Sequence, residues 1–146
     1  MLGPTEPQGQ PTELTVRCRR YLCVACSAVL LVVPCSMLPR RRYSASAIAL
    51  ALALYGIERA PPAQVRRRTS PFSKVGYRAA TSWVTLGRWT DAIRAGQLFG
   101  QVRPCPARFS RRQVAERAAT TLGSRAPPPT DASLTVRAFN GAARGA

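Results

Sequence analysis

The segment SASAIALALALYG, residues 44–56, decides the expected fold. Alanine and leucine have high helix propensities, Ser44 or Ser46 can cap the first turn, and Gly56 can end the helix. The larger residues alternate strictly, as in a buried strand, but alanine at the positions between them favours a helix. Because the segment is apolar on all sides, we expect it to be the central helix of a small bundle.

Upstream of this helix the sequence predicts a β-hairpin. Residues 14–22, LTVRCRRYL, combine β-forming residues with arginine, and residues 28–34, AVLLVVP, are a Val/Leu run that ends at a proline. Between the two runs, Cys23 and Cys26 have the spacing that lets two thiolates hold one tetrahedral metal ion. The hairpin therefore predicts half of a zinc site.

A structural zinc site needs four ligands, and the sequence contains no histidine. Cys18 and Cys35 are the candidates for the other two ligands, although they lie at unusual spacings from Cys23 and Cys26. Two alternatives involve no metal: a reduced cysteine pair in the core, or a redox pair outside the usual βαβ context.

Three further helices are expected after residue 56. The first runs from Pro61 or Pro62 to Arg68, before Pro71. The second spans residues 77–95, with an apolar arc made of Ala79, Trp83, Leu86, Trp89 and Ile93. The third follows a capping box at Ser110 and ends at Gly123.

The net charge of +16 indicates a polyanionic partner. All but one of the 22 basic residues are arginine, whose planar fork binds phosphate bidentately. A GC-rich genome is an alternative source of the arginine bias, but the positive field exists either way. The six acidic residues are far apart in sequence and histidine is absent, so we expect no enzyme activity.

The helices place arginine and threonine where they can reach DNA. We expect a recognition surface on the helix over 77–95 and phosphate contacts from two arginine triplets. The predicted nucleic-acid-binding residues are Arg40, Arg41, Arg42, Arg66, Arg67, Arg68, Arg78, Thr81, Thr85 and Arg88. The competing interpretations are a solvated basic loop at 66–68 and an ordinary amphipathic helix at 77–95.

The apolar run at residues 21–33 also has the length of the core of a signal peptide. It is too short to span a membrane, and sixteen uncharged or acidic residues precede Arg17, whereas a signal peptide carries its positive charge at the start. Export or membrane association is therefore the alternative interpretation rather than the favoured one.

Three segments in order resemble one known family. LTVRCRRYLCVAC at 14–26, PRRRYSASAIALALALYGIE at 39–58 and AATSWVTLGRW at 79–89 are similar to zinc-ribbon and helix-turn-helix proteins associated with bacterial insertion-sequence transposases. The resemblance covers roughly residues 12 to 123. It implies zinc binding, DNA binding and a bacterial, cytoplasmic, nucleoid-associated protein. The chain departs from the family pattern because the upstream Cys-x-x-Cys knuckle and an acidic catalytic domain are missing.

We therefore expect a mostly α protein with a short N-terminal β-hairpin, a small helical bundle of helix-turn-helix type and disordered ends. The expected divisions are 1–13 disordered, 14–39 hairpin and half zinc ribbon, 40–103 helix-turn-helix-like region, 104–123 additional helix and 124–146 disordered tail. The expected function is DNA binding of transposase type without catalysis. The expected partners are DNA and either a transposase or a second copy, with no small-molecule substrate and no membrane. The alternatives are a small exported or membrane-associated basic protein, and a non-functional remnant or spurious reading frame.

Overall fold

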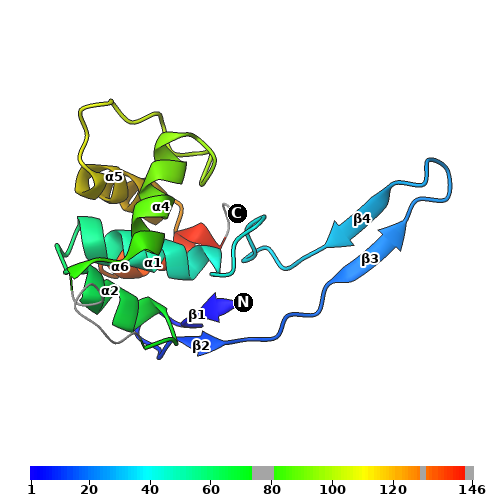
Figure 1. The fold of residues 1–146 in the computed structure, drawn as a ribbon, viewed down its shortest axis with the longest axis horizontal. Helices are drawn as coiled ribbons and strands as arrows, with labels where there is room; N and C mark the ends of the chain where they lie inside the picture. The colour runs from blue at the N-terminus through cyan, green and yellow to red at the C-terminus, as the bar shows by residue number, and fades with distance from the viewer. Residues whose placement is uncertain (74–80, 129–130, 144–146) are drawn as a thin grey trace.

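The computed structural model describes residues 1–73, 81–128 and 131–143, which form a helical bundle with a projecting β-hairpin (Figure 1). The strands pair as two antiparallel ladders, β1 with β2 and β3 with β4. The elements are β1 Leu2–Gly3, β2 Thr12–Glu13, β3 Arg19–Leu22, β4 Val29–Val32, α1 Ala45–Gly56, α2 Pro62–Thr69, α4 Val84–Arg94, α5 Arg111–Gly123 and α6 Leu134–Ala142. This arrangement confirms the prediction of a mostly α fold with a small hairpin.

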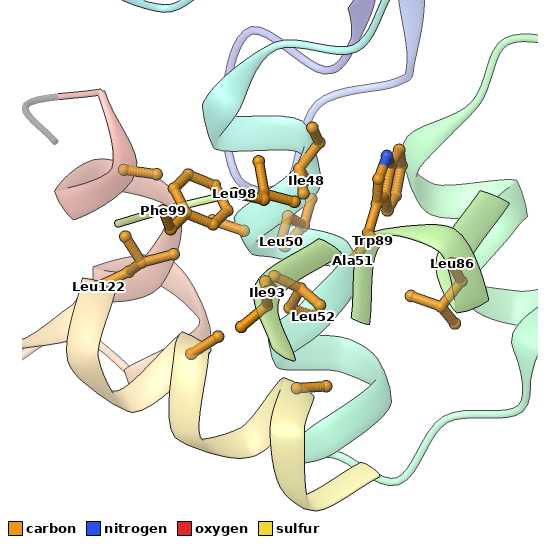
Figure 2. Close-up of a cluster of buried hydrophobic side chains, with 14 of the residues drawn as sticks. Ile48, Leu50, Ala51, Leu52, Leu86, Trp89, Ile93, Leu98, Phe99 and Leu122 are labelled. Atoms are coloured by element: carbon orange, nitrogen blue, oxygen red, sulfur yellow. The ribbon is translucent and has the colours of Figure 1, made fainter. Parts of the chain in front are cut away.

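Helix α1 is the centre of the bundle, as the sequence predicts. The side chain of Ser44 caps it by accepting a hydrogen bond from the backbone N–H of Ala47 at 3.0 Å. Every residue of α1 except Tyr55 is buried, because α2, α4, α5 and α6 all pack around it. Figure 2 shows how Leu50 and Leu52 meet side chains from the surrounding elements. The alternative of a buried strand over this segment is wrong.

Small residues let the helices approach closely. A Cβ added at Gly56 would overlap the backbone of Glu116 on α5, and one added at Gly141 on α6 would overlap the carbonyl oxygen of Leu122. The alanines of α1 and α5 fill the rest of this contact. Close packing of backbone on backbone, with few large side chains, therefore joins α1, α5 and α6.

Helix α2 begins at Pro62, one of the two predicted starts, and ends at Thr69, one residue after the predicted end. Helix α4 begins later than predicted, at Val84. Trp83 is its N-cap and has extended backbone angles, φ −134° and ψ 101°, so the helix does not continue back through this residue. Leu86, Trp89 and Ile93 are buried as the predicted apolar arc requires, and Trp83 is half-buried against the core. Ala79 lies outside the described residues, as do residues 74–76 of the connection between the two predicted helices.

Helix α5 carries the predicted capping box in full. The Ser110 hydroxyl accepts from the backbone N–H of Gln113 at 3.3 Å, and the Gln113 side chain accepts from the backbone N–H of Ser110 at 2.8 Å. Two N–H groups that the helix itself leaves without partners are satisfied in this way.

Replacing Ser110 with alanine is expected to lower the free energy of unfolding by about 1 kcal/mol, because one capping acceptor is lost. Urea denaturation of the variant measures this change. Ser110→Asp retains an acceptor and is expected to stay close to the wild type. Equal stability of the alanine variant and the wild type would contradict a stabilising role for the cap.

The prediction of disordered ends is wrong for the described residues at both ends. Leu2 is buried, its backbone N–H donates to the Arg42 carbonyl at 2.7 Å, and its carbonyl accepts from Ser44 N–H at 3.0 Å. Near the C-terminus, α6 packs on α1 and α5 and buries Phe139. Both segments are ordered by contacts with α1 or its N-terminal end, which their own composition does not reveal.

The hairpin of β3 and β4 projects from the bundle as a two-stranded arm (Figure 1). Its register pairs Arg19 with Val32 and Leu22 with Val29, and residues 23–28 form the tip. All eight residues of the two strands are exposed. The predicted hairpin is confirmed, but it contributes nothing to the buried core.

Candidate nucleic-acid interface

A cavity of about 420 Å³ lies where the segment before α1 meets α2 and α4. We call it the arginine groove, because five arginines line it: Arg40, Arg41, Arg42, Arg66 and Arg88. None of the described residues that line it is acidic. Charges of one sign in a concave site focus the electrostatic field, so the groove is suited to an anion.

The backbone before α1 holds the first three of these arginines. The Arg42 carbonyl accepts from Leu2 N–H, and Arg41 N–H donates to the Leu38 carbonyl at 3.2 Å. Arg40 has a φ of 57°, in the left-handed region that marks a turn. The N-terminal strand β1 thus fixes the course of the triplet against the bundle.

Arg66 is the most enclosed arginine of the groove, with only 8% of its surface exposed. It lies in the last turn of α2, where a cation interacts favourably with the helix dipole. Within residues 1–73, 81–128 and 131–143, no carboxylate forms an ion pair with it. A buried guanidinium without an anion carries a desolvation cost that a bound phosphate would offset.

The predicted triplet at 66–68 is divided by the helix. Arg66 faces the groove, whereas Arg67 is exposed and does not line it. Arg68 instead donates to the carbonyl of Pro7 at 3.3 Å. Successive residues of a helix point about 100° apart, so three neighbouring arginines do not all reach one site.

The predicted residues of the helix expected over 77–95 are divided as well. Thr85 and Arg88 line the arginine groove, while Thr81 is exposed and borders a neighbouring cavity. Arg78 lies outside the described residues.

Aromatic rings form one wall of the groove. Tyr43 and Trp89 meet edge to face with centroids 5.1 Å apart, and Trp83 lies 5.1 Å from Trp89 in the same geometry. The Tyr43 hydroxyl donates to the Ser70 hydroxyl at 2.8 Å, which fixes the ring. Phe72 also lines the groove and is 44% exposed. Sequence reasoning missed Tyr43 and Phe72, although Tyr43 follows directly after an arginine triplet.

The acidic side chains of the protein neutralise little of the positive charge of the groove arginines. Glu13 approaches Arg42 at 4.0 Å, and both side chains are exposed, so this pair contributes little. The other ion pairs among the described residues, Arg59 with Glu116 and Arg111 with Asp91, involve none of the groove arginines. The positive field of the groove therefore persists in the folded chain.

A larger cavity of about 770 Å³ lies along α5. Its lining includes the Arg59–Glu116 ion pair at 3.3 Å and several neutral polar side chains. The charged residues of its lining are Arg59, Glu116 and Arg117, so one acid offsets one of two arginines and the positive field is weaker than in the arginine groove.

The predicted metal ligands Cys23 and Cys26 lie together at the tip of the arm, in the turn between β3 and β4. The pKa of Cys23 is lowered because the backbone N–H of Cys26, then that of Ala25, and the Cys26 side chain stabilise its thiolate. Both thiols are free.

The predicted set of four cysteine ligands is not assembled. Cys18 precedes β3, five residues and about 16 Å of extended chain from Cys23. Cys35 follows β4 and is likewise far from the tip. In the described part of the chain, no three side chains of His, Cys, Asp or Glu are grouped so that they can hold a metal ion. The β-hairpin separates the four residues because it places them at its two ends.

Comparisons of the chain with protein-family models, with curated proteins and with solved structures found no match. Among the described residues, no helix has both the length and the apolar character required to cross a membrane. The assignment of the arginine groove as a candidate interface therefore rests on its geometry and charge alone.

Proposed function

We propose that the chain binds DNA through the arginine groove and catalyses no reaction. The observation that supports this proposal is the convergence of five arginines from three segments on one cavity whose described lining contains no carboxylate. Resemblance to transposase-associated proteins adds a transposase as a further proposed partner, on sequence grounds alone.

The chemistry of the groove fits a phosphate backbone. Arginine forks give bidentate hydrogen bonds to phosphate oxygens, and the release of counterions favours the complex. Buried Arg66 gives the strongest interaction, because water screens it least. The exposed ring of Phe72 and the half-buried ring of Trp83 offer faces against which sugar or base can pack.

The test compares two variants of equal charge, because a chain with a net charge of +16 attracts any polyanion. The first variant replaces groove residues Arg41, Arg66 and Arg88 with glutamine. The second replaces Arg103, Arg108 and Arg125, which are exposed and do not line the groove, with glutamine. Circular dichroism and thermal melting establish that both variants fold.

The dissociation constant for a double-stranded oligonucleotide is measured over a range of salt concentrations. If all five groove arginines neutralise phosphates, the log–log salt slope is about −4.5, and the groove variant reduces its magnitude by about 2.7. The control variant is expected to leave the slope close to that of the wild type. Equal losses in both variants would show diffuse attraction and would refute the groove as the site.

Tryptophan emission provides an independent readout, because both tryptophans of the sequence line the groove. DNA bound there is expected to change the emission in proportion to occupancy. Binding that leaves the emission unchanged would place the DNA elsewhere on the chain.

A further inference from the structure

We propose that two copies of this chain share one zinc ion at the tips of their arms, each copy supplying Cys23 and Cys26. This inference goes beyond DNA binding and does not depend on it, because the arm tip and the arginine groove have no residue in common. Four thiolates from two identical turns would complete a tetrahedral site that one copy leaves half-made.

The turn at the tip brings the two sulfurs to one side. The backbone N–H of Ser27 donates to the Cys23 carbonyl at 2.8 Å, which closes a single helix-like turn over residues 23–27. Positions three apart on such a turn lie on the same face, so Cys23 and Cys26 are neighbours. Ser27, with a φ of 56°, ends the turn, and Cys23 N–H donates to the Ala28 carbonyl at 2.8 Å where the strands begin.

The same turn also orients the Cys23 sulfur. The backbone N–H groups of Cys26 and Ala25 point toward this sulfur. Hydrogen bonds from the backbone to a ligand sulfur also fix its orientation toward the metal.

The missing ligands have to come from another molecule. In the described residues no third metal-ligating side chain joins this pair, and extended strands hold Cys18 and Cys35 away from it. A zinc ion held by two thiolates alone would leave half of its tetrahedral coordination to water.

A second copy fits the tip because the surroundings of the pair are apolar and uncharged. No charged residue occurs from Tyr21 to Val33. Leu22 is 65% exposed and Val24 is 98% exposed, so large apolar side chains flank the thiols without cover. A symmetric contact would bury these side chains against their own copies, in addition to the metal.

The arm also reduces the electrostatic repulsion between two strongly basic chains. It projects away from the helices (Figure 1), so the bundles stay apart when the tips meet. Salt screens charges beyond about 10 Å at 0.1 M ionic strength, which limits the remaining repulsion between the bodies. The four thiolates and one zinc ion together carry two negative charges, which offsets part of the positive charge on Arg19 and Arg20.

The test titrates zinc, and cobalt as a visible probe, into the reduced full-length chain while light scattering measures its mass. The expected result is one zinc per two chains, a doubling of mass, and the strong visible absorption of cobalt in a tetrahedral thiolate site. Cys23→Ser and Cys26→Ser are each expected to abolish the doubling of mass. Cys18→Ser, Cys35→Ser and Cys105→Ser are expected to behave as the wild type.

Three outcomes would overturn the proposal. One zinc per monomeric chain would mean that the ligands come from a single copy. A dimer that survives chelation of the metal under reducing conditions would mean that the apolar tip associates without zinc. Absence of metal binding in a chain whose circular dichroism shows the folded bundle would mean that the thiol pair holds no metal.

Discussion

The Gly56→Ala variant is expected to have a free energy of unfolding about 2 to 3 kcal/mol below that of the wild type. In an exposed helix the same substitution would stabilise by about 1 kcal/mol, because alanine is the better helix former. At Gly56 the added methyl group overlaps the backbone of Ala115 and Glu116 on α5. Backbone cannot rotate away as a flexible side chain does, so α1 and α5 must separate and lose packing along their length.

Gly100→Ala is the matched control, since an added Cβ there meets no atom within 4 Å. Its stability is expected to stay within about 0.5 kcal/mol of the wild type. Thermal melting followed by circular dichroism separates the two variants, with a decrease in Tm of roughly 5 to 10 °C for Gly56→Ala. An unchanged or raised Tm for Gly56→Ala would show that α1 and α5 do not pack this closely.

The second large effect is expected at two positions on opposite sides of α1. Leu50→Ala and Leu52→Ala should each lower the free energy of unfolding by about 3 kcal/mol, because each leaves a cavity in close-packed surroundings. Residues two apart on a helix point about 200° apart, so a one-sided amphipathic helix would bury only one of this pair. Both are at most 1% exposed here, since neighbouring helices cover α1 on all sides.

Urea denaturation at equilibrium measures both changes. Val84→Ala, at a side chain that is 66% exposed, removes methyl groups without leaving a buried cavity and should change the stability by less than about 0.5 kcal/mol. A large loss at only one of the two leucines would be inconsistent with α1 as a central helix.

Local signals in the sequence predicted most of the bundle. Ser44 as a cap, the alanine-rich course of α1 and the capping box at Ser110 each depend on residues within one or two turns of each other. These interactions form in the same way whatever the rest of the chain does. The hairpin could be predicted equally well, because two runs of β-forming residues flank a short turn.

The parts that sequence reasoning missed depend on contacts between distant residues. Helix α6 has a cap at Ser133, but its order comes from packing against α1 and α5, including the close approach of Gly141 to Leu122. Strand β1 is held by hydrogen bonds to residues 42–44, some forty positions away. Glycine- and proline-rich composition suggested disorder because it does not reveal such partners.

The charged residues of the candidate site could be predicted from the sequence, but their arrangement around one cavity could not. Arginine triplets are visible in the sequence. Which arginine lines the groove depends on how α2 is rotated about its axis against the bundle, and this rotation places Arg66 in the groove but not Arg67. Tyr43 was not predicted because its role depends on the edge-to-face contacts that it makes with Trp83 and Trp89 from another element.

The central position of α1 has a consequence for how the chain is made. The ribosome completes Ala45–Gly56 long before Arg111–Gly123 and Leu134–Ala142, the two helices that cover most of it. At about 5 to 20 residues per second, roughly 4 to 17 s pass between the synthesis of this most apolar helix and that of the last helix that covers it. During synthesis this segment is therefore the one that chaperones or neighbouring chains would meet first.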